Sequence, residues 1–339
     1  MKPFYLVGGA QKPDGLRKEE WHSHEKGLIV RIDPSTNKGE VCLEYITPPE
    51  YLPEKDPNIL FKAATFGPRS CFMCTSTEVL EYSFPDFRLL RRISHPCFND
   101  VHHVHVADNG HLFVANTGLD MVVEMAPTGE IVRMWNTLGD PNPWGRFSPD
   151  VDYRKVPTTK PHQSHPNFVF TVGEQVWVTR FHQKDAICLT EPDKRIPIEI
   201  QSPHDGQVVG KNVYFTTVDG HLIVANLETL KVEAVHDLAA MHTGIRKVGW
   251  CRGVAVLDEG RVLVGFTRLR PTKWKANLNW LKTGLRELKA FMHQPARVAL
   301  FDLARQKKVW EFHLDVLGMS TVFSIHPDPS ETAETKIAA

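Results

Sequence analysis

Histidines are frequent in this chain, and several of them stand where a repeated strand pattern begins. There are 17 histidines in 339 residues, and His103, His165 and His204 lie at the starts of three successive apolar strands. Neutral imidazoles that converge from neighbouring strands suit Zn(II), Fe(II) or another divalent transition metal. These three residues are therefore the predicted ligands of a divalent metal, while Asp100 and Asp205 could orient the neighbouring rings. The competing interpretation is that each histidine is a hydrogen-bonded structural residue.

Other polar residues near the same strand starts complete a candidate site. Lys62 and Arg252 are expected to lie across the channel and to bind an anionic group of a substrate. His102 precedes His103 directly, so the two side chains should point in different directions. We expect His102 or His162 to transfer protons during catalysis.

The strands that carry these residues belong to a repeat. Six hairpins combine an apolar strand, a turn rich in Pro, Asp, Thr or Gly, and a more charged strand. A second, more apolar hairpin precedes five of them. Four strands in roughly 40 residues are typical of a propeller blade. The outer hairpins are Gly27–Ile46, Glu78–Ile93, Met121–Trp135, Ala186–Ile200, Leu222–Val235 and Val298–Phe312, and the inner ones are Ala63–Met73, Val104–Val114, Phe168–Val178, Gly206–Phe215 and Val254–Val264.

The first repeat lacks one strand, and a matching strand occurs at the other end of the sequence. The repeat begins with Phe4–Val7, and the missing strand is Thr321–Ile325. Closure by strands from both termini would remove an exposed sheet edge. We therefore predict an all-β fold, a six-bladed β-propeller over residues 1–326, followed by a disordered tail at 327–339. The competing fold is a two-sheet sandwich, which does not explain six matching hairpins.

The long connections all fall on one face of the predicted propeller, which is typical of a functional face. One of them, Asn136–His165, is expected to place an aromatic wall over the mouth of the channel with Trp144, Phe147 and Tyr153. The four long connections are Gly9–Lys26, Thr47–Pro57, Asn136–His165 and Thr267–Pro295.

The insertion at 267–295 contains a helical pattern. Residues 274–292 (WKANLNWLKTGLRELKAFM) place leucines at helical spacing, with lysines and an arginine on the other side. This predicts a basic amphipathic helix inserted in the sixth blade. Three interpretations stay open: a cap packed on the propeller, a contact with a membrane surface, or a docking helix for a protein partner.

Composition excludes several function classes. The 40 Lys+Arg balance 40 Asp+Glu, and a net charge of zero argues against nucleic-acid binding. We find no apolar run of about 18 residues, as a membrane span would need, and no secretory signal. The six cysteines favour reduced thiols in the cytoplasm. Phosphate-binding glycine loops, serine-hydrolase elbows and zincin helices are missing, which lowers the odds of those chemistries.

Residues 100–135 (DVHHVHVADNGHLFVANTGLDMVVEMAPTGEIVRMW) resemble a blade of the six-bladed NHL-repeat and SMP-30/strictosidine-synthase-like superfamily. The resemblance implies the fold more than a function. Members that hold calcium use Glu, Asn and Asp, and this sequence departs from them with His, Lys and Arg. Peptidyl-hydroxyglycine amidating lyases hold zinc with three histidines beside an arginine, to which His103, His165, His204 and Arg252 are similar in kind.

The leading hypothesis is a metal-dependent lyase or hydrolase that acts on a small polar or anionic substrate. The zinc or iron would polarise a substrate oxygen or activate water at the top of the channel. One alternative is a non-catalytic propeller that binds a protein partner or a membrane surface through residues 274–292. A further alternative is a non-haem iron oxygenase.

Overall fold

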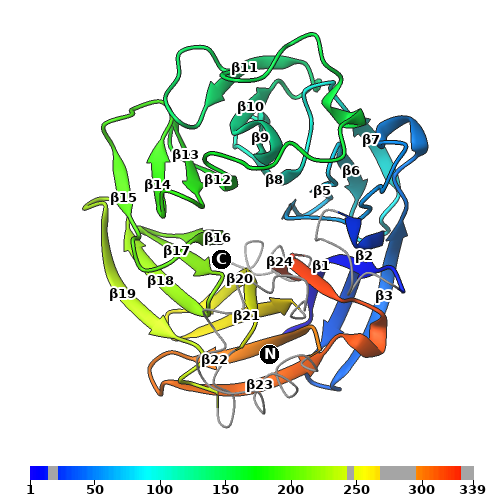
Figure 1. Cartoon of the computed structure of the whole chain (residues 1–339). Helices are drawn as coiled ribbons and strands as arrows, with labels where there is room; N and C mark the ends of the chain where they lie inside the picture. Colours follow the sequence, from blue (N-terminus) through cyan, green and yellow to red (C-terminus); the bar gives the residue numbers. More distant parts are fainter. Residues whose placement is uncertain (14–21, 243–247, 268–294, 330–339) are drawn as a thin grey trace, which may run out of the picture.

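The computed structural model describes residues 1–13, 22–242, 248–267 and 295–329. In these ranges the chain forms six four-stranded antiparallel sheets, which follow one another around a ring (Figure 1). The protein is therefore an all-β, six-bladed propeller, as the repeat predicts.

Each blade uses four strands that are consecutive in the sheet, and the first strand named below is the innermost. Blade 1 is β24(Thr321–Pro327), β1(Phe4–Gln11), β2(His24–Asp33) and β3(Lys38–Tyr45); blade 2 is β4(Ala64–Phe66), β5(Ser70–Cys74), β6(Val79–Ser83) and β7(Leu89–Ile93); blade 3 is β8(Val101–Val106), β9(Leu112–Asn116), β10(Met121–Met125) and β11(Ile131–Asn136). Blade 4 is β12(Pro166–Val172), β13(Gln175–Arg180), β14(Asp185–Cys188) and β15(Arg195–Pro197); blade 5 is β16(Pro203–Val209), β17(Asn212–Thr217), β18(His221–Asn226) and β19(Lys231–Asp237); blade 6 is β20(Trp250–Asp258), β21(Arg261–Thr267), β22(Arg297–Asp302) and β23(Lys307–His313).

The burial of each strand follows its position in the blade. Strand β9, in the middle of blade 3, is buried along its whole length. Strand β19, at the outer edge of blade 5, alternates between exposed and half-buried residues. A strand covered on both faces must be apolar throughout, whereas an outer strand keeps one polar face in water.

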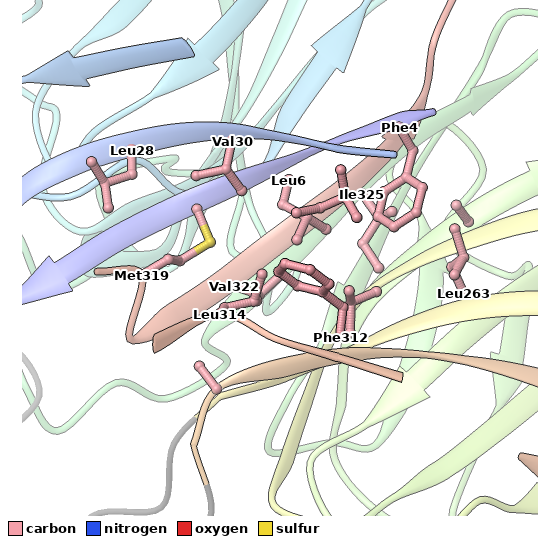
Figure 2. Close-up of a cluster of buried hydrophobic side chains, with 14 of the residues drawn as sticks. Phe4, Leu6, Leu28, Val30, Leu263, Phe312, Leu314, Met319, Val322 and Ile325 are labelled. Atoms are coloured by element: carbon pink, nitrogen blue, oxygen red, sulfur yellow. The ribbon is translucent and has the colours of Figure 1, made fainter. Parts of the chain in front are cut away.

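The two ends of the chain close the ring in one sheet. Strand β24 pairs antiparallel with β1, and Leu6 lies opposite Ile325. Around this pair, a hydrophobic cluster joins blade 1 to blade 6 (Figure 2). The cluster includes Val322 of β24 together with Leu263 and Phe312 of blade 6. Burial of these apolar side chains stabilises the closed ring.

The innermost strands share an irregularity near their starts. In blades 3 to 6 the register of the innermost strand shifts within its first residues, between Val101 and His103, Pro166 and Val169, Pro203 and Gly206, and Arg252 and Val254. A bulge changes the alternation of side chains at that point. Neighbouring residues there can therefore face different parts of the channel.

In the described ranges the connections include the short 3-10 helices η3(Pro49–Tyr51), η4(Thr117–Leu119), η5(Tyr153–Lys155) and η7(Asp315–Leu317). The predicted helix at 274–292 lies outside the described residues, and so does most of the predicted tail. Among the helices of the described ranges, none has the length and apolar character needed to cross a membrane. The six cysteines all fall in these ranges, and none forms a disulfide.

The aromatic residues of the 137–165 connection pack on blade 3. Tyr153 is buried in the hydrophobic cluster of this blade, and Trp144 and Phe147 pack against the same cluster. The Tyr153 amide donates to the Pro96 carbonyl, which ties the loop to the body of the propeller. The expected aromatic wall over the channel is therefore wrong, because these three rings pack on blade 3 and none of them lines the cavity at the channel mouth.

Candidate functional site

A cavity of about 570 Å³ lies at the end of the channel where the innermost strands begin. We call it the upper cavity, and its volume is in the range of small-molecule sites. Every blade contributes a residue to its wall. In the order of blades 1 to 6, these are Phe323, Lys62, His102, His165, His204 and Arg252.

The structure does not bring His103 together with His165 and His204. His103 lines a different cavity. Its Nδ1 accepts a hydrogen bond from the Val169 amide at 3.2 Å, and its ring packs on that of Phe168 with the ring centroids 5.0 Å apart. The bulge at the start of β8 turns His102, not His103, toward the upper cavity. His102 lies 5.1 Å from His165 and 5.5 Å from His204, measured between ring centroids. The three imidazoles that converge are thus His102, His165 and His204.

His102 belongs to a buried charged group. Its Nε2 lies 3.5 Å from Asp100 Oδ1, and the same oxygen forms an ion pair with Lys62. Burial, together with the Lys62 ammonium, lowers the pKa of His102 to about 3. Burial alone would raise the pKa of Asp100, but Lys62 and His102 hold it well below its usual range. Lys62 therefore balances a buried carboxylate, and His102 is neutral at physiological pH.

The tautomer of His165 follows from a chain of hydrogen bonds. The Thr159 hydroxyl donates to the Gly118 carbonyl, so it accepts from His162 Nε2 at 3.3 Å. His162 Nδ1 then carries the lone pair, and it accepts from His165 Nδ1 at 2.7 Å. Burial lowers the pKa of His162 to about 4, and burial beside His102 holds that of His165 well below its usual range. His165 is therefore neutral, with a lone pair on Nε2.

Asp120 is a positioning residue that sequence reasoning missed. Its buried carboxylate accepts from the backbone amides of Gln163, Ser164 and His165, at 2.9, 2.8 and 2.9 Å. These bonds hold His165 in a left-handed conformation with a φ of 58°. Such a conformation is strained for a residue with a Cβ, so it needs support from the surrounding structure. No signal in the sequence links Asp120 to a segment more than 40 residues later.

His204 is oriented by its neighbour. Its Nδ1 donates to Asp205 Oδ2 at 2.9 Å, which places the lone pair on Nε2. The Gly253 amide donates to the same oxygen at 2.9 Å, so Asp205 also joins blade 5 to blade 6. Burial alone would raise the pKa of Asp205, but these two donors lower it. The pair is a carboxylate and an imidazole with a defined tautomer, as the sequence predicts for Asp205.

Arg252 is held between two aromatic rings. Its guanidinium carbon lies 4.3 Å from the Phe323 centroid and 5.3 Å from that of Trp250. These cation–π contacts restrict the position of the guanidinium. The described lining of the upper cavity carries three cations, Lys62, Lys160 and Arg252, against the one carboxylate of Asp100. This excess of positive charge favours an anionic ligand.

The three converging imidazoles have lone pairs of the kind that bind metals, with partners on the other ring nitrogen of each. Within the described ranges, however, His, Cys, Asp and Glu side chains form no group of three that could hold a metal ion. The arrangement as it stands does not fit a resident metal. Zinc or iron stays a prediction from the sequence, and no step proposed below depends on it.

Buried neutral histidines make the stability of this fold depend on pH. Burial lowers the pKa of both His102 and His103 to about 3, whereas the unfolded chain keeps the ordinary value of 6.5. Below pH 6.5 the unfolded state therefore binds more protons, and the free energy of unfolding should fall. We expect a loss of up to about 1.4 kcal/mol per pH unit for each such histidine, down to pH 4.

Urea unfolding at pH 7.5, 6 and 5 would measure this loss. The variant His103→Gln keeps an acceptor for the Val169 amide but does not titrate, so its urea midpoint should fall less steeply. A midpoint that stays constant or rises between pH 7.5 and 5 would contradict the assignment of neutral histidines.

The fold and site define the class: a six-bladed propeller with a histidine-rich cavity on its axis. The structure is similar to a protein of unknown function from Bacteroides caccae, with a TM-score of 0.60 and 13% identity, over 96% of this chain and 98% of that one. It is also similar to a chain of a nidogen/laminin complex, with a TM-score of 0.55 and 10% identity, over 95% and 97% of the two chains. No family model matches the sequence, and no curated protein does. These likenesses show the fold alone.

Proposed function

We propose that the upper cavity is the active site of a lyase or hydrolase for a small anionic substrate. The observation that carries this proposal is the convergence on the axis of the imidazoles of His102, His165 and His204 beside the guanidinium of Arg252. Histidines with assigned tautomers are suited to proton transfer, and a stacked arginine is suited to binding an anionic group.

In this proposal the substrate anion binds at Arg252, and Lys160 adds positive charge to the same cavity. His165 takes a proton on Nε2, because His162 and Thr159 hold its other nitrogen as a donor. The imidazolium that forms is stabilised through this hydrogen-bonded chain. The imidazolium of His165 then returns this proton from Nε2 to the leaving group or product, and His204, oriented by Asp205, lines the same cavity.

We also infer membership of the NHL-repeat and SMP-30/strictosidine-synthase-like superfamily. Support comes from residues 100–135, which carry the sequence resemblance and occupy one complete blade, β8 to β11.

Turnover of small anions tests the proposed function. The probes are 4-nitrophenyl phosphate and 4-nitrophenyl sulfate for hydrolysis, and malate for elimination, followed by the absorbance of the alkene. We expect turnover of at least one probe, and His165→Gln should lower kcat by roughly 100-fold or more, as loss of a general base does.

The matched control is His111→Gln. His111 lies in a hairpin turn outside the upper cavity and bonds Glu124 at 2.8 Å. Its replacement should leave turnover unchanged. If no probe binds or reacts, or if His165→Gln keeps the full rate, the proposal fails. Repeating the assay after dialysis against a chelator would test the predicted metal separately.

A further inference from the structure

A second cavity, of about 340 Å³, lies along the same channel beyond the upper one. We call it the lower cavity, because its walls come from later residues of the innermost strands, such as Phe66 of β4, His105 of β8 and His326 of β24. At several places along the channel, two consecutive residues line different cavities. The first residue of each such pair lines the upper cavity, and the second lines the lower cavity. These pairs are Lys62 and Ala63, His102 and His103, His204 and Asp205, Arg252 and Gly253, and Phe323 and Ser324.

The two cavities differ in charge. In the part of the chain that the structure describes, the lower cavity is lined by one carboxylate, Asp205, and by neither lysine nor arginine. Three histidines, His103, His105 and His326, also line it. The net charge of this wall is therefore negative, which favours a cation.

The carboxylate of Asp205 has room for a further donor. Its bonds to His204 Nδ1 and to the Gly253 amide both go to Oδ2, so Oδ1 keeps its acceptor capacity. An ammonium group has three donors and would complete the set. A charge-assisted hydrogen bond of this kind is about twice as strong as a neutral one.

Aromatic rings form much of the remaining wall. Phe66 stacks on His326, with centroids 4.3 Å apart and planes at 12°, and Phe168 stacks on Phe170 at 5.2 Å. Ring faces attract organic cations and also pack against an apolar body. A ligand with one ammonium group and a flat apolar part matches both features.

We propose that the lower cavity binds a small organic cation, a protonated primary amine with an apolar body, whose ammonium group is held by Asp205. This site is distinct from the active site proposed above in position and in the charge it selects. It does not depend on whether the upper cavity is catalytic.

Calorimetric titration of the full chain with three molecules of matched shape tests the proposal. The probes are phenethylammonium, the neutral 2-phenylethanol and the anionic phenylacetate. We expect phenethylammonium to bind at least tenfold more tightly than 2-phenylethanol. Any binding of phenylacetate should be unaffected by the replacement of Phe66, which lines the lower cavity alone.

Two variants locate the bound cation. Asp205→Asn should weaken the binding of phenethylammonium by roughly tenfold or more, and Phe66→Leu should weaken the same binding by roughly fivefold. Because Asp205 also bonds His204 and Gly253, Phe66→Leu serves as the test if Asp205→Asn does not fold. The control is Asp100→Asn, which removes the carboxylate of the upper cavity and should leave this binding unchanged. Equal affinity for the neutral alcohol, unchanged binding in Phe66→Leu, or loss of binding in Asp100→Asn would each overturn the proposal.

Discussion

Replacing Arg252 by methionine is expected to weaken the binding of inorganic phosphate by roughly tenfold to a hundredfold. This is the usual effect of losing a hydrogen bond to a charged group. Arg252 is 2% exposed and stacks on Phe323 and Trp250, so its guanidinium is fixed before a ligand arrives. Methionine keeps the unbranched apolar stem between the two rings and removes only the charge and the donors. Titration calorimetry on both proteins measures the change.

Two further variants separate charge from geometry. Arg252→Lys keeps the charge but loses the planar fork, so its affinity should fall between those of the native protein and Arg252→Met. The matched control is Arg133→Met, because Arg133 also lies over a tryptophan, 5.3 Å from the Trp135 ring, but on the outer strand β11. Native affinity in Arg252→Met, or an equal loss in Arg133→Met, would exclude Arg252 as the anion-binding residue.

Replacing Asp120 by alanine should lower the free energy of unfolding by about 3 kcal/mol or more. The change leaves three amides of the segment 163–165 without their acceptor. The bond of Ser164 is buried and the other two are part-buried, and a buried donor that loses its acceptor costs about 1 to 3 kcal/mol. The segment should also lose the conformation that presents His165 to His162. The urea midpoint measures stability, and imidazole ¹⁵N spectra report the tautomer of His165.

Further variants separate the loss of the Asp120 carboxylate from the effect of the substitution on the backbone conformation at this position. Asp120 itself has a φ of 53°, a conformation that asparagine tolerates better than alanine does. Asp120→Asn keeps one acceptor oxygen and should therefore lose less stability. Asp152→Ala removes a carboxylate that is 36% exposed and bonds mainly Arg154, so it should cost less than about 1 kcal/mol. An Asp120→Ala protein as stable as Asp152→Ala would contradict the role assigned to Asp120.

The fold could be predicted from the sequence because each blade repeats one local pattern. The inner hairpin is buried on both faces and is apolar, whereas the outer hairpin is buried on one face and carries more charge. Both patterns can be recognised within some 40 residues. Ring closure could also be predicted, since β24 supplies the strand that the first repeat lacks. The predicted helix at 274–292 is not tested, because it lies outside the described residues.

The site could be predicted only in part. Its location at the starts of the innermost strands and five of its residues, Lys62, His102, His165, His204 and Arg252, were recognisable from the repeat. The choice of His103 over His102 rested on its alignment with the strand starts of the other repeats. It failed because a bulge at Val101–His103 turns His102 toward the upper cavity. The pairing of Lys62 with Asp100 was equally invisible, since it joins residues 38 positions apart.

The sequence by itself determined that six similar blades form a ring and that histidines gather at one end of its channel. Local hydrophobic periodicity carries that information, because burial acts on each strand separately. The tertiary structure alone decided which histidine nitrogens carry a lone pair and how Asp120 holds His165. It also decided that consecutive residues divide the channel into a cationic and an anionic cavity. Those features depend on contacts between blades, and such contacts leave no periodic trace along the chain.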